Sequence, residues 1–177
     1  IPFEKAKLFY ELIIKHGKKY DLCHAGSHAM DILRMEKGYL HWGHDISPKE
    51  NSYEAGLDFA ISYKKNIEFI GKKKLLEIKN KPIKKKLMIF SIIDSKPGEP
   101  LTLHDEPIYC DGKIIGITTS GNFSFNFSKN LIFGYIKNDN IQNLENKSLE
   151  VEVEKNKYKI SIENKPLFDP QNRYIKS

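Results

Sequence analysis

The stretch LEVEVEKNKYKISI, residues 149–162, decides the fold of the second half of the chain. Before a turn predicted at Lys155-Asn156, apolar residues alternate with glutamates, and after it they alternate with lysines and a serine. A period of two places the apolar side chains on one face of a strand and the charged ones on the other. Each Glu–Lys pair across the outer face contributes up to about 1 kcal/mol. The stretch therefore predicts an antiparallel hairpin with one buried face.

Strand and turn signals extend from this hairpin back to residue 84. The apolar run 87–93 predicts a buried strand, and Asp111-Gly112 predicts a second hairpin. Residues 121–128 alternate three phenylalanines with Asn and Ser, which predicts a half-buried strand with the aromatic rings on one face. We expect residues 84–170 to form an antiparallel barrel or sandwich.

The first 83 residues have an α+β pattern. Helical spacing predicts helices over residues 3–16 and 27–37, closed by Gly17 and Gly38. Further elements are expected as strands at 20–25 and 56–63 and as a basic helix at 69–79. The chain begins without Met, and we expect it to be a fragment of a longer protein.

Charge is concentrated in one run of the 177 residues. The net charge is +6, and residues 72–86 hold eight lysines and one acid, Glu77, which leaves 21 bases and 22 acids elsewhere. Such a run can bind nucleic acid or an acidic partner, or it can be a solvated helix face and linker. Arginine, the better bidentate phosphate ligand, is absent from it. We expect no nucleic-acid partner, and no membrane partner because no apolar run approaches the roughly 20 residues of a spanning helix.

No catalytic or metal-binding motif is present. Cysteine and histidine gather between residues 23 and 45, but without the spacing of a structural zinc site: Cys23, His24, His28, His41, His44 and Asp45. A nucleophile elbow and the glycine-rich loops of nucleotide-binding proteins are also absent. We expect no metal site and no catalytic residue in this chain, and we expect Cys23 and Cys110 to be buried free thiols in strands.

Six stretches together resemble one family. The longest is AMDILRMEKGYLHWGHDI, residues 29–46; the others are Glu54-Ala55-Gly56-Leu57, Phe69-Ile70-Gly71, Glu106-Pro107-Ile108 with Asp111-Gly112, Gly116-Ile117-Thr118-Thr119-Ser120-Gly121 and Pro166-Leu167-Phe168-Asp169-Pro170. In this order they resemble the folate-dependent aminomethyltransferases, the glycine cleavage T-protein family. The sequence of these stretches is most similar to the C-terminal region of dimethylglycine and sarcosine dehydrogenases.

The resemblance implies a fold and a function. It implies the C-terminal part of a three-lobed aminomethyltransferase fold, with residues 1–83 ending the folate-binding lobe and residues 84–177 forming an antiparallel β-barrel. The parent would be an enzyme that captures the one-carbon unit of N-methyl amine oxidation as 5,10-methylenetetrahydrofolate, while the fragment alone is inactive. Its partners would be tetrahydrofolate and the upstream lobes, with FAD only in a module outside this chain. Alternatives are a fragment of a glycine cleavage T-protein and a non-catalytic folate-binding relative.

The resemblance also implies roles for individual residues. Folate contacts are expected at Tyr39, Met30, Trp42, His44 and Arg173, where Met30 replaces an arginine of T-proteins and Tyr39 would stack on a flat ring. A core position for Tyr39 and loop packing for Trp42 and His44 are the alternatives. Arg34 and Glu36 are expected to be ion-paired structural residues. The expected location is the cytoplasm, or the mitochondrial matrix in a eukaryote.

Overall fold

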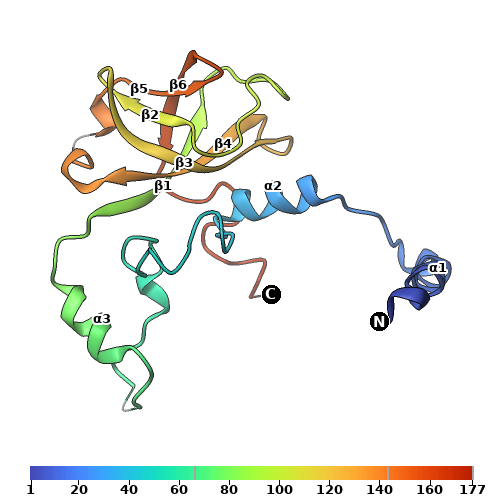
Figure 1. Cartoon of the computed structure of the whole chain (residues 1–177). Helices are drawn as coiled ribbons and strands as arrows, with labels where there is room; N and C mark the ends of the chain where they lie inside the picture. The colour runs from blue at the N-terminus through green and yellow to red at the C-terminus, as the bar shows by residue number, and fades with distance from the viewer. Residues whose placement is uncertain (66, 143, 177) are drawn as a thin grey trace. The chain divides into compact units, whose positions relative to one another are not determined.

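A computed structural model describes residues 1–65, 67–142 and 144–176. The chain divides into two compact units, Ile1–Met30 and Asp31–Ser177. Its α-helices are α1 (Ala6–Gly17), α2 (Ser27–Lys37) and α3 (Lys72–Lys79), as drawn in Figure 1. Short 3-10 helices occur at Phe3–Lys5, Lys18–Tyr20, Asp58–Ala60, Asn138–Asn140 and Leu144–Asn146. None of the helices in the described ranges is long and apolar enough to cross a membrane.

Six antiparallel strands form a closed barrel in the second unit. They are β1 (Lys85–Ile92), β2 (Pro107–Cys110), β3 (Lys113–Ser124), β4 (Lys129–Lys137), β5 (Leu149–Val153) and β6 (Asn156–Glu163). The order around the barrel is β1-β4-β3-β2-β5-β6, which closes because β6 pairs with β1. The predicted antiparallel barrel is confirmed. The domain boundary between residues 83 and 84 stays a prediction.

The hairpin of residues 149–162 has the predicted charge pairing. Glu150 lies opposite Lys159 and Glu152 lies opposite Lys157, as the alternation requires. The turn is one residue earlier than predicted, at Glu154 and Lys155, with φ angles of 51° and 66°. A two-residue turn with two positive φ angles matches the right-handed twist of the strands it joins, which explains the shift.

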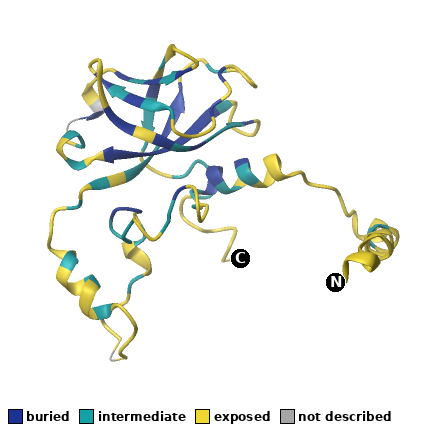
Figure 2. Cartoon of the chain, in the orientation of Figure 1, coloured by how far each residue is buried: buried dark blue, intermediate teal, exposed yellow. Residues whose placement is uncertain are grey.

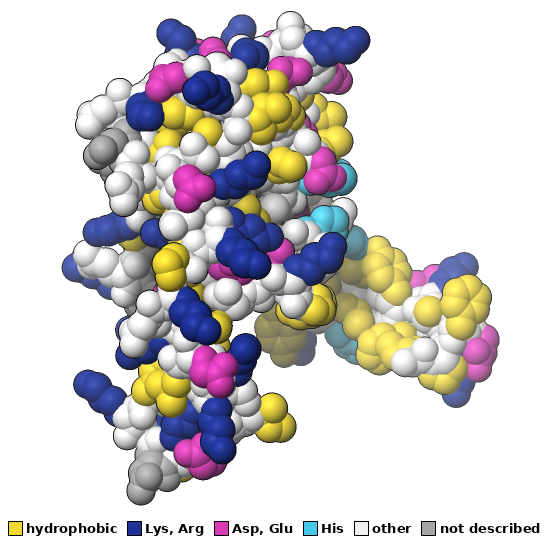
Figure 3. Space-filling model, turned by 60° about the vertical axis from the view of Figure 1, so that its left-hand side comes forward, with side chains coloured by type: hydrophobic (Ala, Val, Ile, Leu, Met, Phe, Trp, Pro, Cys, Tyr) yellow, Lys and Arg dark blue, Asp and Glu magenta, His cyan; other side chains and the backbone are white. Residues whose placement is uncertain are grey.

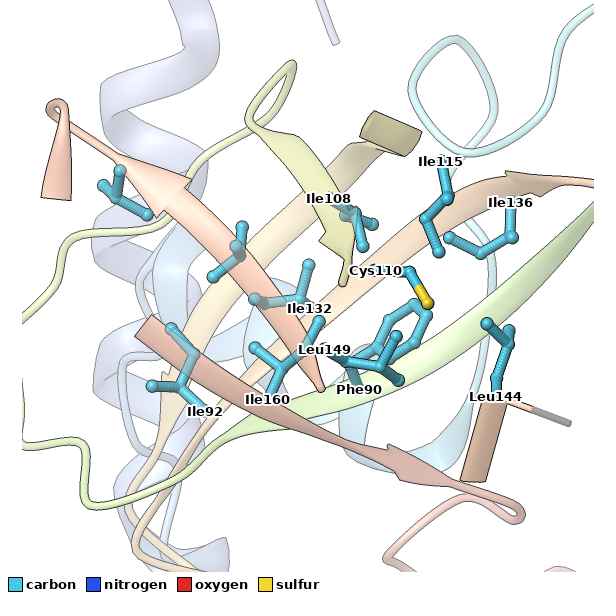
Figure 4. Packing of buried hydrophobic residues seen from close by; sticks show 12 residues of the cluster. Phe90, Ile92, Ile108, Cys110, Ile115, Ile132, Ile136, Leu144, Leu149 and Ile160 are labelled. Carbon is cyan, nitrogen blue, oxygen red and sulfur yellow. The ribbon is translucent and has the colours of Figure 1, made fainter. Parts of the chain in front are cut away.

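The barrel interior is filled by apolar side chains from all six strands. Figure 4 shows Phe90, Ile108, Ile132 and Leu149 converging there, with Cys110 among them. Burial raises the pKa of the Cys110 thiol. The expectation of a buried thiol is therefore confirmed for Cys110.

Strand β4 is buried on both faces. Ile132 and Ile136 point into the barrel, whereas Leu131 and Phe133 point outward and pack against Ile32 and Met35 of α2. Four half-buried apolar residues complete this outer cluster: Leu40, Leu87, Ile89 and Leu167. Figure 2 shows the resulting burial in the C-terminal half of α2 and in the strands beside it. A second apolar core thus joins residues 31–37 to the outside of the barrel.

Two predicted strands of the first half are wrong. Residues 20–25 begin at the end of a 3-10 helix and turn at Asp21, whose φ is 54°, and Cys23 is exposed rather than buried. Residues 56–63 begin at Gly56, with a φ of 70°, and continue into a 3-10 helix. Positive φ breaks an extended backbone, and alternation alone cannot hold a strand without a neighbour to pair with.

The strand predicted over residues 121–128 is wrong in its second half. Strand β3 ends at Ser124, and a turn with positive φ at Ser128 leads into β4. Phe125 is 74% exposed, whereas Ser124 is fully buried. Ser124 is thus the residue of this stretch that packs inward, where its hydroxyl donates to the buried Glu36 carboxylate, whereas Asn126 and Ser128 are exposed.

Candidate functional site

Three charged residues at the end of α2 meet three different parts of the second unit. Successive helix positions point about 100° apart, so Glu36 points away from the helix face that carries Arg34 and Lys37. Glu36 and Lys37 are buried and Arg34 is largely buried. A buried charge is costly unless it is paired and hydrogen-bonded, so each of these side chains needs defined partners.

Arg34 is paired with two carboxylates. Its guanidinium lies 2.7 Å from Asp31 Oδ1 and 2.6 Å from Asp45 Oδ2, and it donates to Ser120 Oγ at 2.8 Å and to the Tyr39 carbonyl oxygen at 3.1 Å. It also lies over the Phe133 ring, 5.8 Å from the centroid. The planar fork of arginine suits such a set of acceptors.

Asp45 receives hydrogen bonds from three elements. Oδ2 accepts from Arg34 and from the His41 backbone N–H at 2.8 Å, and Oδ1 accepts from Thr119 Oγ1 at 2.6 Å and Ser120 Oγ at 2.8 Å. The Tyr135 hydroxyl donates to the Asp45 carbonyl oxygen at 3.0 Å. The segment after α2 is thereby fastened to β3 and β4.

Glu36 is held by neutral donors. Ser124 Oγ donates to Oε1 at 2.6 Å, and the Asn126 amide donates to Oε2 at 2.9 Å. Its backbone carbonyl oxygen accepts from the Phe168 N–H at 2.9 Å. No ion pair involves Glu36 within residues 1–65, 67–142 and 144–176, so the predicted ion pairing of Glu36 is wrong for the described residues. Glu36 instead forms hydrogen bonds to the end of β3 and to the C-terminal tail.

Lys37 binds the C-terminal tail. Its Nζ lies 3.0 Å from Asp169 Oδ2, with the two side chains 8% and 3% exposed, and it also donates to the Asp169 carbonyl oxygen. Burial raises the pKa of Asp169, but Lys37 and the backbone N–H groups of Arg173 and Tyr174 more than offset this and lower it below its ordinary value of 3.8. The pair ties the tail to α2.

The depressed pKa of Asp169 predicts a pH-dependent contribution to stability. Because the folded state holds the proton more weakly than the unfolded state, the contribution is complete above about pH 4 and is lost as the pH falls through the lower, folded-state pKa. Urea unfolding should therefore show wild type to be more stable than Asp169→Asn at pH 6, with the difference shrinking below pH 4. An unchanged difference down to pH 2 would contradict this assignment.

A cleft of about 810 Å³ lies beside these contacts. Its walls come from the end of α2 and the residues after it, the turn around Gly56, the start of β1 and the tail after β6. The lining is mainly apolar. Its charged residues are Lys86 and Lys165, the Lys37–Asp169 pair, and Glu163, which is paired with Lys129. Volumes of 300–1,000 Å³ with a few polar groups are typical of small-molecule sites.

The predicted folate residues do not all reach this cleft. Tyr39 lines it and is 53% exposed, which removes the alternative of a core tyrosine. Trp42 and His44 are exposed and are not among its lining residues, and His44 stacks on His41 with 4.5 Å between ring centroids. Arg173 follows Asn172, which lines the cleft. Met30 is the last residue of the first unit, and its side chain is exposed.

Three buried site residues were not singled out for this role from sequence: Lys37, Asp45 and Asp169. In the sequence, Asp45 stands out only at the end of the group of His and Cys residues between 23 and 45, and among the described residues no group of three or more His, Cys, Asp and Glu could hold a metal ion. The usable signal was the isolated charge inside an apolar pattern, since buried charges need partners. Their partners across the barrel and the C-terminal tail lie 74 to 132 positions away, which no local pattern reveals.

The basic run does not gather into a separate site. Lys72 pairs with Glu68, Lys74 with Glu77, and Lys85 with Glu50. Figure 3 shows lysines around α3 mixed with acidic and apolar side chains. This distribution favours the interpretation of a solvated helix and linker.

Two family models match consecutive parts of the chain. Residues 1–65 match the GCVT N-terminal domain, and residues 85–169 match the glycine cleavage T-protein C-terminal barrel domain. The chain belongs to the glycine cleavage T-protein family, which confirms the resemblance seen in its sequence.

Individual relatives are much longer than this chain. It is 34% identical over 134 residues to the mitochondrial dimethylglycine dehydrogenase of Rattus norvegicus, covering 75% of this chain and 15% of that protein. It is also 34% identical to the mitochondrial pyruvate dehydrogenase phosphatase regulatory subunit of Mus musculus, over 78% of this chain and 16% of that protein. The chain therefore spans less than a fifth of either relative.

A solved structure has the same fold. The glycine cleavage system aminomethyltransferase T from Bartonella henselae superposes with a TM-score of 0.77 at 23% identity, covering 96% of this chain and 45% of that one. The expected C-terminal part of the aminomethyltransferase fold is thus confirmed.

Proposed function

We propose that this chain is part of the folate-binding C-terminal region of a dimethylglycine- or sarcosine-dehydrogenase-like enzyme. The observation that carries the proposal is the cleft lined by Tyr39. Its apolar walls and the half-exposed aromatic ring suit a flat heteroaromatic ligand, and Lys86 and Lys165 suit a carboxylate-bearing tail. Tetrahydrofolate has both parts.

In the parent enzyme this chain would bind and orient rather than react. Tetrahydrofolate would supply the nitrogen atoms that take up the one-carbon unit, giving 5,10-methylenetetrahydrofolate. The walls of the cleft would hold the ligand in place and exclude water, which favours transfer over loss of the one-carbon unit to solvent. The catalytic groups and the FAD-dependent oxidation belong to regions outside this chain, so the chain alone is expected to be inactive.

The remaining site assignments are part of the same proposal. Trp42 and His44 would border the mouth of the folate channel, Met30 would stand where T-proteins place an arginine, and Arg173 would meet the carboxylates of the ligand. The upstream lobes of the same protein would complete the channel. We place the parent in the cytoplasm, or in the mitochondrial matrix if the organism is a eukaryote. The two relatives named above are mitochondrial proteins, which supports the second location.

A non-catalytic relative is the second candidate. The similarity to a regulatory subunit, at the same 34% identity as to the dehydrogenase, favours it. In that case the fold would bind folate without turnover. A glycine cleavage T-protein is the third candidate, supported by the match to that protein's barrel domain. Amine-dependent formation of 5,10-methylenetetrahydrofolate by the complete parent would select the dehydrogenase.

The Tyr39→Ala substitution tests the site. In calorimetric titration of the complete parent with a tetrahydrofolate analogue, we expect the variant to bind about tenfold more weakly, since loss of an aromatic contact costs on the order of 1.4 kcal/mol. Phe125→Ala is the matched control, because it removes an exposed aromatic ring that does not line the cleft. Equal binding by Tyr39→Ala and wild type would remove Tyr39 from the site, and no binding by the wild-type parent would refute the proposed function.

A further inference from the structure

The segment that carries Tyr39 has few apolar anchors of its own. His41, Trp42, Gly43 and His44 are four consecutive exposed residues. Within the segment, the Asp45 N–H donates to the His41 carbonyl oxygen at 2.9 Å, and the Gly43 N–H donates to the Ile46 carbonyl oxygen at 2.8 Å. Such a turn, with solvent-exposed hydrogen bonds and little burial, opens easily unless something else holds it.

The Asp45 carboxylate supplies that hold. It is fully buried, and its four donors come from α2 (Arg34), from the segment itself (His41) and from β3 (Thr119 and Ser120). Ser120 Oγ donates to Asp45 and accepts from Arg34, so the three side chains form a closed ring. Hydrogen bonds to a charged acceptor are the strong ones, and inside a protein they reinforce one another.

The same ring fixes the backbone of Tyr39. One nitrogen of Arg34 donates both to Asp45 Oδ2 and to the Tyr39 carbonyl oxygen, at 2.6 Å and 3.1 Å. Asp31 and Ser120 hold the other two guanidinium nitrogens, and Asp45 is the charged acceptor of the nitrogen that faces Tyr39. Tyr39 lines the cleft, and Arg34 holds its backbone at two points, because the Tyr39 N–H also donates to the Arg34 carbonyl oxygen at 2.8 Å.

We infer that Asp45 is a positioning residue: its carboxylate locks the segment of residues 39–46 onto β3 and holds Tyr39 at the cleft. This inference rests on the proposed function for the identity of the ligand. The locking of the segment does not depend on the proposed function, because it concerns only contacts within this chain. Asp45 touches neither the cleft nor a reacting group.

The test replaces Asp45 by its neutral isostere in the complete parent. Asp45→Asn leaves one acceptor oxygen where two served four donors. We expect hydrogen exchange at the His41 amide, whose acceptor is Asp45 Oδ2, to accelerate about tenfold or more, and the affinity for a tetrahydrofolate analogue to fall by a similar factor. Glu36→Gln is the matched control, because it makes the same chemical change at a buried acid that binds Ser124 and Asn126. It should leave exchange at residues 41–46 unchanged.

Each outcome decides one of the two proposals. Unchanged exchange at His41 in Asp45→Asn overturns the inference, as does acceleration that Glu36→Gln reproduces, because the effect would then be general destabilisation. Faster exchange with unchanged affinity in a folate-binding parent also overturns it. If the wild-type parent does not bind folate, the proposed function fails, whereas the exchange measurement still decides the locking. If Asp45→Asn does not fold, Thr119→Val removes one donor and should give a smaller acceleration of the same amide.

Discussion

Phe133→Ala is expected to lower the free energy of unfolding of the second unit by about 3–5 kcal/mol. Phe133 is fully buried on the outer face of β4, where it packs with Ile32 and Met35 of α2. Truncation removes the transfer free energy of the ring and leaves a cavity that closed barrel strands cannot collapse to fill. It also removes the ring face beneath Arg34.

Phe125→Ala is the control for this substitution. It deletes the same ring from a position that is 74% exposed, and its cost should stay within about 0.5 kcal/mol. Urea denaturation of both variants, followed by tryptophan fluorescence and by circular dichroism, gives the two values. Equal effects would mean that α2 does not form a tight core with β4 in solution.

Arg34→Met is expected to be comparably destabilising. The substitution keeps the apolar stem but leaves Asp45, which has no exposed side-chain surface, as an uncompensated buried charge. Removing one partner of a buried pair costs about 3–5 kcal/mol. Arg34→Lys should recover only part of the lost free energy of unfolding, because one lysine ammonium group cannot reach all the acceptors that the planar guanidinium of Arg34 contacts.

A double-mutant cycle tests the cause of this cost. In Arg34→Met/Asp45→Asn the uncompensated charge is gone, so the double variant should be less destabilised than the sum of the single variants, with a coupling on the order of 1–3 kcal/mol. The measurement is urea unfolding of all four proteins at one pH. Additive effects would show that the charge interaction contributes little and that the loss is one of packing.

The fold of the second half could be predicted because its signals are local. The Glu–Lys register of the hairpin at residues 149–162 and the Asp111-Gly112 turn each depend on neighbours within one hairpin. The strands predicted at residues 20–25 and 56–63 failed because alternation is also compatible with turns when no partner strand is near. Strand pairing is a property of two segments, and only one of them is visible in a local pattern.

The candidate site was less predictable for the same reason. Tyr39 was found through resemblance and does line the cleft, but its role in folate binding stays a prediction. Asp45 has two donors nearby in sequence, Arg34 and the His41 N–H, but its other donors include Ser120, which lies 75 positions away. Likewise, the burial of Ser124 could not be predicted, because its partner Glu36 lies 88 positions away.

The junction between α2 and the barrel has a consequence for how such proteins recombine. The two family models divide the chain between residues 65 and 85, yet residues 31–65 pack into one unit with the barrel. In a chimera of two relatives with a crossover at residues 66–84, Asp45 would come from one parent and Thr119 and Ser120 from the other. We therefore expect residues 31–65 and the barrel to be exchanged best as one block in such chimeras.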